Sequence, residues 1–311
     1  MAEKMATREA YGNALVEFGA KYEDLVVLDA DVSSATKTAA FGKKFPDRFI
    51  NCGIAEGNMV SVAAGIAATG KIPFASSFAM FAAGRAFEPI RNAIGYPHLN
   101  VKIGATHAGI TVGEDGATHQ CCEDIGIMRT IPGMTIINPA DAVEARAAVE
   151  AAILYKGPVY LRFGRLAVPV IFEAGSYKFE MGKGIQISEG KDASIIATGI
   201  MVGEALKARE MLANDKIDAA VVNIHTIKPL DKDIIIKAAK TKAVVTAEEH
   251  NIIGGLGSAV AEVLAENSPC PMGRIGVKDE FGRSGKAEEL MKIFGLTAEH
   301  IAKKVKEILR K

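Results

Sequence analysis

Short apolar segments alternate with helix-like segments along most of the chain, and this alternation constrains the fold more than any other feature of the sequence. Residues 7–22 carry apolar side chains at helical spacing, and an alanine-rich helical segment follows Gly53. The segments typical of buried strands are LVVLDA (25–30), KIPFASSF (71–78), LNVKIGATH (99–107) and PVYLRF (158–163). Such alternation predicts an α/β fold, in which parallel-sheet-rich layers are covered by helices on both faces.

The alternation is interrupted once, and the interruption predicts two domains. Between residues 168 and 190 the sequence contains several glycines and no long helical pattern. Strand-like segments then return as ASIIATG (193–199), DAAVVNI (218–224), KAVVTAEE (242–249) and RIGVKD (274–279), and a final amphipathic helix begins at Thr297. We therefore expect one α/β domain over residues 1–175, a linker over 176–189 and a second α/β domain over 190–311.

Charge and hydropathy argue against several classes of function. The 37 basic residues equal the 37 acidic residues in number, so there is no bulk electrostatic basis for binding nucleic acid or an anionic membrane. No apolar run approaches the roughly 20 residues that span a bilayer, and the first residues, MAEKMATREAYG, lack the apolar core of a signal peptide. We expect a soluble, cytoplasmic protein. The adjacent Cys121 and Cys122 are predicted to be small buried residues rather than metal ligands.

The segment ATHAGITVGEDGATHQ (105–120) is dense in polar groups and has neither a helical nor a strand period, so we expect a loop. Two histidines, His107 and His119, flank the acidic pair Glu114 and Asp115. Three interpretations are open: a metal site, an ordinary glycine-rich loop, or an active-site loop at the carboxyl end of a strand. Histidines can relay protons near neutral pH, which favours the last interpretation.

Single residues elsewhere in the chain also suggest a site. Glu56 lies where a strand leads into an apolar helix, so the helix N-terminus would stabilise its anion while burial would raise its pKa. Such a carboxyl group could cap the helix or share a proton with a ligand nitrogen. Five arginines could bind anions, although each taken alone is expected to be a surface or structural residue: Arg8, Arg85, Arg91, Arg162 and Arg165. The segment GGLGSAV (254–260) lacks the full G-x-G-x-x-G spacing, so we predict close packing there rather than nucleotide binding.

Taken together, these segments resemble the C-terminal half of transketolase over nearly the whole chain. GEDGATHQ (113–120) is similar to the family's GEDGPTHQ loop, and ATH (105–107) is similar to its partner segment. The matching segments ATR (6–8), ADVSS (30–34), SSFAMF (76–81) and RLAVP (165–169) occur in the family's order. The resemblance implies a pyrimidine-binding domain followed by a transketolase C-terminal domain. It also implies transfer of a two-carbon glycolaldehyde unit from a ketose phosphate to an aldose phosphate, in the pentose phosphate pathway.

The resemblance implies a thiamine diphosphate site made by four residues of this chain. Glu56 is similar to the catalytic glutamate that exchanges a proton with the aminopyrimidine ring of the cofactor. Phe81 is similar to the aromatic residue that stacks on that ring, with Phe78 beside it. Asp31 is similar to an acidic residue that lines the cofactor cleft.

The same resemblance implies a substrate site on neighbouring loops. His119 is similar to a catalytic histidine at the terminal hydroxyl of the donor sugar, and Asp115 is similar to a carboxylate at another sugar hydroxyl. Arg8, His107 and Arg165 are similar to the residues that hold the sugar phosphate.

The sequence departs from the family pattern in ways that bear on its partners. Ala35 stands where a phosphate-binding serine is usual, Gly84 where a tyrosine is common, and Asn58 where a histidine is common. The G-D-G motif of the family's N-terminal domain, which holds the diphosphate and its metal, does not occur in this sequence. We therefore predict no metal ligands in this chain and a separate N-terminal transketolase chain that holds Mg²⁺ or Ca²⁺. Because the family's sites form between subunits, the predicted complex is a heterotetramer with a homodimer contact.

Alternatives stay open at this stage. GIAEG (53–57) and FAAGRAFE (81–88) resemble 1-deoxyxylulose-5-phosphate synthase, although His107 favours transketolase. A transketolase subunit for another sugar, such as a sulfonated or branched one, would carry the same motifs. The beta chain of 2-oxo-acid dehydrogenases shares the implied domain pair, but the THQ segment (118–120) argues against it. A metal hydrolase and a non-catalytic regulatory subunit are further alternatives, and the retained Glu56, Asp115 and His119 argue against the latter.

Overall fold

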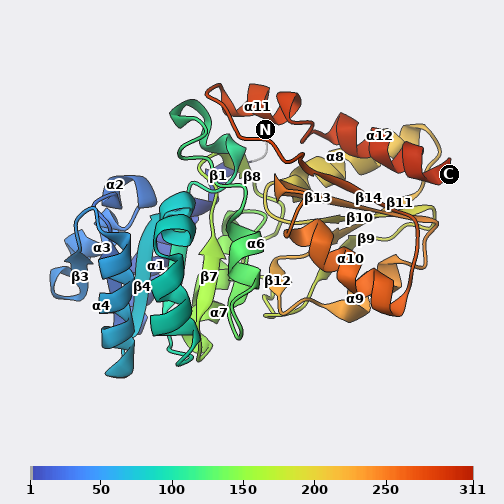
Figure 1. The fold of residues 1–311 in the computed structure, drawn as a ribbon. Helices are drawn as coiled ribbons and strands as arrows, with labels where there is room; N and C mark the ends of the chain where they lie inside the picture. Colours follow the sequence, from blue (N-terminus) through green and yellow to red (C-terminus); the bar gives the residue numbers. More distant parts are fainter. Residues whose placement is uncertain (1–2, 311) are drawn as a thin grey trace.

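The computed structural model describes residues 3–310, which form two α/β units side by side (Figure 1). The α-helices are α1 (Thr7–Lys21), α2 (Ser33–Thr36), α3 (Ala39–Lys44), α4 (Glu56–Ala68), α5 (Phe87–Pro89), α6 (Asp124–Arg129), α7 (Ala142–Leu154), α8 (Met201–Asn214), α9 (Lys232–Ala238), α10 (Leu256–Asn267), α11 (Ala287–Ile293) and α12 (Ala298–Leu309). The strands are β1 (Lys4–Ala6), β2 (Leu25–Asp29), β3 (Phe49–Asn51), β4 (Ile72–Phe78), β5 (Lys102–Thr106), β6 (Thr135–Ile137), β7 (Val159–Arg162), β8 (Ala167–Pro169), β9 (Ile185–Ser188), β10 (Ala193–Ala197), β11 (Ala219–Asn223), β12 (Thr226–Lys228), β13 (Ala243–Asn251) and β14 (Met272–Val277). Tighter or wider turns are the 3₁₀ segments η1 (Pro46–Arg48) and η4 (Ile110–Asp115) and the π-helical segments η2 (Met80–Arg85) and η3 (Ile90–Gly95).

The first unit is built on a seven-stranded sheet with strand order β12-β6-β7-β5-β4-β2-β3. The pairs from β6 to β3 are parallel, and β12 at the edge runs antiparallel to β6. Helices α1 and α7 pack on one face around Tyr11 and Leu15, and α4 covers the other face with Met59 and Val60. Because both faces are covered, the central strands are mostly apolar, with a few buried polar side chains such as Ser76 and Lys102. The predicted α/β class is confirmed.

The second unit is built on a five-stranded sheet with strand order β14-β13-β10-β11-β9. Helices α8 and α12 cover one face and α9 and α10 the other (Figure 1). The edge strand β9 is antiparallel to β11 and comes from residues 185–188, within the segment expected as a linker. The apolar stripe of α12, which includes Ile301, Val305 and Ile308, is buried against the sheet as the amphipathic pattern predicts.

The two units share a continuous boundary. Strand β12 belongs to the second half of the chain, yet Thr226 pairs with Ile137 at the edge of the first sheet. One apolar cluster contains Ile125 and Met128 of α6 together with Ile224 and Leu256 from the second half. A shared core of this kind fixes how the second unit faces the loops of the first.

The segment at 105–120 is more regular than the uniform loop expected from the sequence. Its first two residues complete β5, and residues 110–115 form the 3₁₀ segment η4. Gly109, Gly113 and Gly116 have φ values of 79°, 85° and 79°. The path of this segment depends on backbone conformations that glycine adopts readily. The spacing of apolar residues in the sequence therefore could not predict the 3₁₀ segment.

One local prediction from the sequence, close packing at residues 254–260, is confirmed, and the structure adds a helix cap at α7. Asp141 caps α7 and accepts a hydrogen bond from the Glu144 backbone N–H at 2.8 Å, although the Glu144 carboxylate bonds to the Ala140 N–H instead of returning to Asp141. At GGLGSAV, a Cβ on Gly255 would lie 2.0 Å from the Glu248 carboxylate. The glycine there permits close packing.

Candidate active site

The carboxyl ends of neighbouring parallel strands bring the predicted site residues to one edge of the first sheet. Strand β2 leads to Asp31, β4 ends at Phe78, β5 is followed by His107, and β7 is followed by Arg165. Open α/β sheets form ligand clefts at this edge, because the loops there leave the covered part of the sheet. The topology therefore collects residues that are far apart in the sequence.

Four rings form the centre of this edge. The Phe78 ring stacks on the His107 imidazole, with ring centroids 3.8 Å apart, and its centroid is 5.7 Å from that of Phe81. The His119 ring meets Phe81 edge-on at 5.3 Å. Phe78 is buried and Phe81 is half-buried, so Phe81 is better placed to offer a face to a ligand.

Glu56 is the buried carboxylate of the site. It begins α4 and is 2% exposed. Arg85, from η2, donates from Nη1 to Glu56 Oε2 at 3.2 Å, and its guanidinium carbon lies 5.3 Å from the centroid of the Phe81 ring. A flat cation with N–H donors therefore contacts both the Glu56 carboxylate and the Phe81 ring.

His107 is neutral in this environment. Burial, reinforced by the charges of Arg8 and Arg165, lowers the pKa of His107 to about 3. Arg8 Nη1 lies 3.1 Å from His107 Nε2, and a guanidinium can only donate, so Nε2 accepts. The Nδ1–H then donates to Thr106 Oγ1 at 2.9 Å. His107 thus orients Arg8 without adding a positive charge of its own.

A hollow of about 290 Å³ opens beside these rings and is rich in cations. It is lined by Arg8, Arg165 and Lys286, with Glu114 and Glu288 at its walls. Arg165 Nη1 pairs with Glu114 Oε2 at 3.3 Å. Lys286 comes from the second unit, just before α11, and sequence reasoning missed it because no motif marks its position. Three cations against two carboxylates leave the hollow with a positive balance.

Two aspartates lie at the carboxyl end of β2 and have different roles: Asp29 is its last residue, and Asp31 follows it. The exposed Asp31 has φ 65° and accepts a hydrogen bond from Asn51 Nδ2 at 2.8 Å. Asp29 is fully buried, and burial raises its pKa. Its carboxylate accepts hydrogen bonds from the Val32 N–H, the Thr36 hydroxyl and the Thr38 hydroxyl. Asp29 therefore shapes the loop that carries Asp31, a role that the sequence did not reveal.

The remaining residues singled out from the sequence lie at the rim. Asp115, at the end of η4, Asn58, in the first turn of α4, and Gly84, within η2, are exposed. Ala35 offers its backbone carbonyl, which accepts a hydrogen bond from Arg8 Nη1 at 2.8 Å. The backbone at position 35 thus helps to hold the guanidinium that faces the hollow.

The part of the chain from residue 3 to residue 310 offers no group of three His, Cys, Asp or Glu side chains that could hold a metal ion. Cys121 and Cys122 are buried thiols whose pKa values are raised by burial, as expected of packing residues. Within the same range, no helix is both long and apolar enough to cross a membrane.

Comparison with known families identifies the domains. Residues 3–170 match the family described as transketolase, pyrimidine binding domain, and residues 182–301 match the family described as transketolase, C-terminal domain. This pair of α/β domains, with a polar cleft at the carboxyl edge of the first sheet, defines the class of protein. The chain belongs to the transketolase family, whose members use thiamine diphosphate.

Individual relatives match the chain over nearly its full length. A protein of Methanocaldococcus jannaschii with the provisional name of a transketolase C-terminal section is 56% identical, over 98% of this chain and 96% of that protein. A 6-deoxy-6-sulfo-D-fructose transketolase subunit of Clostridium sp. (strain MSTE9) is 45% identical, over 97% and 94%. A solved structure titled split gene transketolase, inactive beta4 tetramer, is 51% identical with a TM-score of 0.91, over 99% of each chain. The predicted resemblance to a split transketolase C-terminal subunit is confirmed.

Proposed function

We propose that this chain is the C-terminal subunit of a split transketolase of the pentose phosphate pathway. It would transfer a two-carbon glycolaldehyde unit from a ketose phosphate to an aldose phosphate. The observation that carries the proposal is that one edge of the first sheet carries both a buried carboxylate beside an aromatic face and a cationic hollow, linked through the contacts of His107 with Phe78 and Arg8. The first, Glu56 with Phe81, suits a pyrimidine ring, and the second, with Arg8 and Arg165, suits a sugar phosphate.

The contacts of Arg85 support the fit of Glu56 and Phe81 to the aminopyrimidine of thiamine diphosphate. Its guanidinium, like that ring, is flat and carries N–H donors, and it contacts both side chains. When bound, thiamine diphosphate supplies the nucleophilic carbon that carries the two-carbon unit. Glu56 would hold and return a proton at the pyrimidine nitrogen, and its burial would keep that proton from water. The exposed Arg85 would turn away as the ring enters.

The substrate would lie across the remaining residues of the cleft. Arg8 and Arg165 offer forked donors to phosphate oxygens, and Lys286 adds a third cation beside them. Asp115 and His119, on the adjoining loop, would contact hydroxyl groups of the donor sugar. Because the phosphate and the hydroxyl groups of the sugar would both be bound, the orientation of its carbonyl carbon toward the cofactor would be fixed.

A separate N-terminal transketolase chain would complete the site. It would hold the diphosphate and Mg²⁺ or Ca²⁺, in a heterotetramer with a homodimer contact. Two observations support this arrangement: the G-D-G motif does not occur in the sequence, and the related structure is titled a split gene transketolase.

The test is to assay the chain alone and with a candidate N-terminal chain, in the presence of thiamine diphosphate and Mg²⁺. Xylulose 5-phosphate and ribose 5-phosphate would be the substrates and sedoheptulose 7-phosphate the product. We expect product from the mixture and none from the chain alone. Glu56→Gln should lower kcat by about 100-fold or more, because it removes a positioned proton carrier. A formed complex that gives no product from these sugars would refute the assigned substrates.

One observation favours a second candidate substrate. The relative from Clostridium is named for a sulfonated ketose, and a sulfonate would find the same cations in the hollow of this chain. The chain would then be a sulfosugar transketolase subunit. Comparing kcat/KM for the phosphorylated and sulfonated donors on the same complex decides between the two.

A further inference from the structure

The loop over residues 107–122 is held by the second unit near both of its ends. The Thr111 backbone N–H donates to Glu249 Oε1 at 2.7 Å, and the Asn251 N–H donates to the Cys122 carbonyl at 2.8 Å. Gln120 Nε2 donates to the carbonyl of Arg283 at 2.9 Å. The first sheet begins this loop, and the second unit holds it at these three points.

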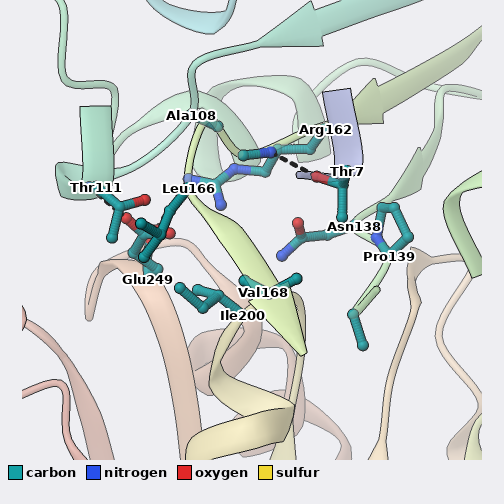
Figure 2. A pocket seen from close by; sticks show the side chains of 12 residues that line it. Thr7, Ala108, Thr111, Asn138, Pro139, Arg162, Leu166, Val168, Ile200 and Glu249 are labelled. Atoms are coloured by element: carbon teal, nitrogen blue, oxygen red, sulfur yellow. Dashed lines mark hydrogen bonds between the residues drawn. The ribbon is translucent and has the colours of Figure 1, made fainter. Parts of the chain in front are cut away.

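The contact with Glu249 is close and buried. Glu249 is 3% exposed, and its side chain faces Thr111 beside a cavity of about 20 Å³, which has room for about one water molecule (Figure 2). A Cβ on Gly109 would lie 2.3 Å from the Glu249 carboxyl carbon, so the backbone approaches the carboxylate as closely as only glycine allows. Arg162 Nη2 donates to the backbone carbonyl of Glu249 at 2.9 Å, which holds this residue in turn.

We propose that Glu249 is a positioning residue for the transferase reaction. By holding the Thr111 N–H it fixes η4, and it thereby sets where Asp115 and His119 meet the donor sugar. The roles of Asp115 and His119 rest on the proposed function, whereas the contact between Glu249 and the loop does not. Loops carry much of an enzyme's function but are mobile unless tied down. A displacement of about 1 Å in a positioning group can cost about 100-fold in rate.

The neighbouring Glu248 provides a matched control. It is also a buried carboxylate on β13, and burial raises the pKa of both side chains. Successive residues of a strand face opposite sides, and Glu248 accepts hydrogen bonds from the Leu256 and Gly257 backbone N–H groups at 2.6 and 2.8 Å. It therefore holds the start of α10 and leaves the loop untouched.

The first measurement is hydrogen exchange on the full chain without its partner. Glu249→Met removes the acceptor at similar volume, and exchange in a peptide over 107–120 should rise about 10-fold or more. Glu248→Met should raise exchange at the start of α10 and leave 107–120 unchanged. Should Glu249→Met fail to fold, Glu249→Asp keeps the charge but is one methylene shorter, and the same rise is expected. Unchanged exchange in 107–120 in folded Glu249→Met, or in folded Glu249→Asp where the Met variant does not fold, would overturn the proposal.

The second measurement separates positioning from general damage, using the complex with its N-terminal chain. Glu249→Met should raise KM for the donor and lower kcat/KM about 10- to 100-fold, with the affinity for thiamine diphosphate unchanged. Glu249→Gln, whose amide oxygen can accept the Thr111 N–H, should recover most of the loss. Equal losses of cofactor affinity and of kcat/KM, or no rescue by Gln, would overturn the positioning role. A wild-type complex without transferase activity would refute the proposed function, while the exchange result would stand by itself.

Discussion

The ion pair between Arg162 and Asp124 lies where the first sheet, the loop over residues 107–122 and the second unit meet, and Arg162→Met tests its contribution to stability. The two side chains are 3% and 0% exposed, with Arg162 Nε 2.8 Å from Asp124 Oδ2. Arg162 Nη2 also donates to the carbonyls of Cys121 and Glu249. In the variant, Asp124 would keep the Tyr160 hydroxyl, at 2.9 Å, as a donor.

The magnitude follows from what the substitution leaves behind. Removing one partner of a buried ion pair costs about 3–5 kcal/mol, because a charge stays buried without compensation. A buried carbonyl that loses its guanidinium donor adds about 1–3 kcal/mol if it is left without a partner, although the Cys121 carbonyl keeps the Gly109 N–H. The losses share one guanidinium and are not additive, so we expect the free energy of unfolding to fall by about 5 kcal/mol.

Urea denaturation at pH 7 and fixed protein concentration measures this change. With a denaturant slope of about 3 kcal/mol per molar, the midpoint should fall by about 1.7 M. The matched control is Arg146→Met, which removes a surface arginine whose partner Glu17 is 50% exposed. That variant should lose no more than about 1 kcal/mol.

A double variant isolates the buried charge as the cause. Arg162→Met combined with Asp124→Asn replaces the stranded carboxylate with a neutral group of similar shape, so it should be more stable than Arg162→Met alone. The reasoning is wrong if Arg162→Met costs no more than Arg146→Met, or if the double variant is the less stable of the two.

Three further predictions follow from other contacts. Burial lowers the pKa of His225 to about 4, so between pH 6.5 and pH 4 a proton binds the unfolded chain but not the folded one, and stability is lost as the pH falls. His225→Asn should therefore reduce the loss of stability between pH 6.5 and pH 5 by about 2 kcal/mol, measured by urea denaturation at both pH values. Lys286→Ala should raise KM about 10-fold for a phosphorylated donor and leave an unphosphorylated ketose unaffected, in steady-state assays of the complex. Asp141→Ala should cost about 2 kcal/mol in the same denaturation experiment, because Asp141 caps α7 and also accepts the Ile171 and Phe172 N–H groups; an unchanged midpoint would exclude the cap as a stabilising contact.

Local pattern was sufficient to predict most of the central strands and covering helices. Apolar runs such as 25–30 and 158–163 correspond to β2 and β7, because a strand buried on both faces is apolar at most of its positions. The edge strands β9 and β12 were not predicted. Strand β12 has three residues and is a strand because it pairs with β6, about ninety positions earlier in the chain. The local hydrophobic pattern cannot predict such a distant pairing.

The candidate site was predicted from polar residues and family motifs rather than from hydrophobic periodicity. Glycines and polar groups at 105–120 suggested an active-site loop, and family motifs suggested roles for Glu56 and Phe81. Glu249 and Lys286 were not predicted as site residues, because neither belongs to a recognised motif and neither interrupts the hydrophobic pattern of its segment. Each matters through contact with a distant segment, as in the bond between Thr111 and Glu249, which joins residues 138 positions apart.

The sequence by itself determined the α/β class, most of the central strands, the glycine positions of the loop over residues 107–122 and the chemical groups available to a site. These depend on burial periods and backbone freedom, which each residue carries within its own neighbourhood. The tertiary structure alone decided that Arg85 contacts Glu56, that His107 is neutral beside Arg8, and that the second unit holds the loop over the cleft. Electrostatics and hydrogen bonds act over a few ångströms in space, whatever the separation along the chain, so only the folded arrangement could determine them.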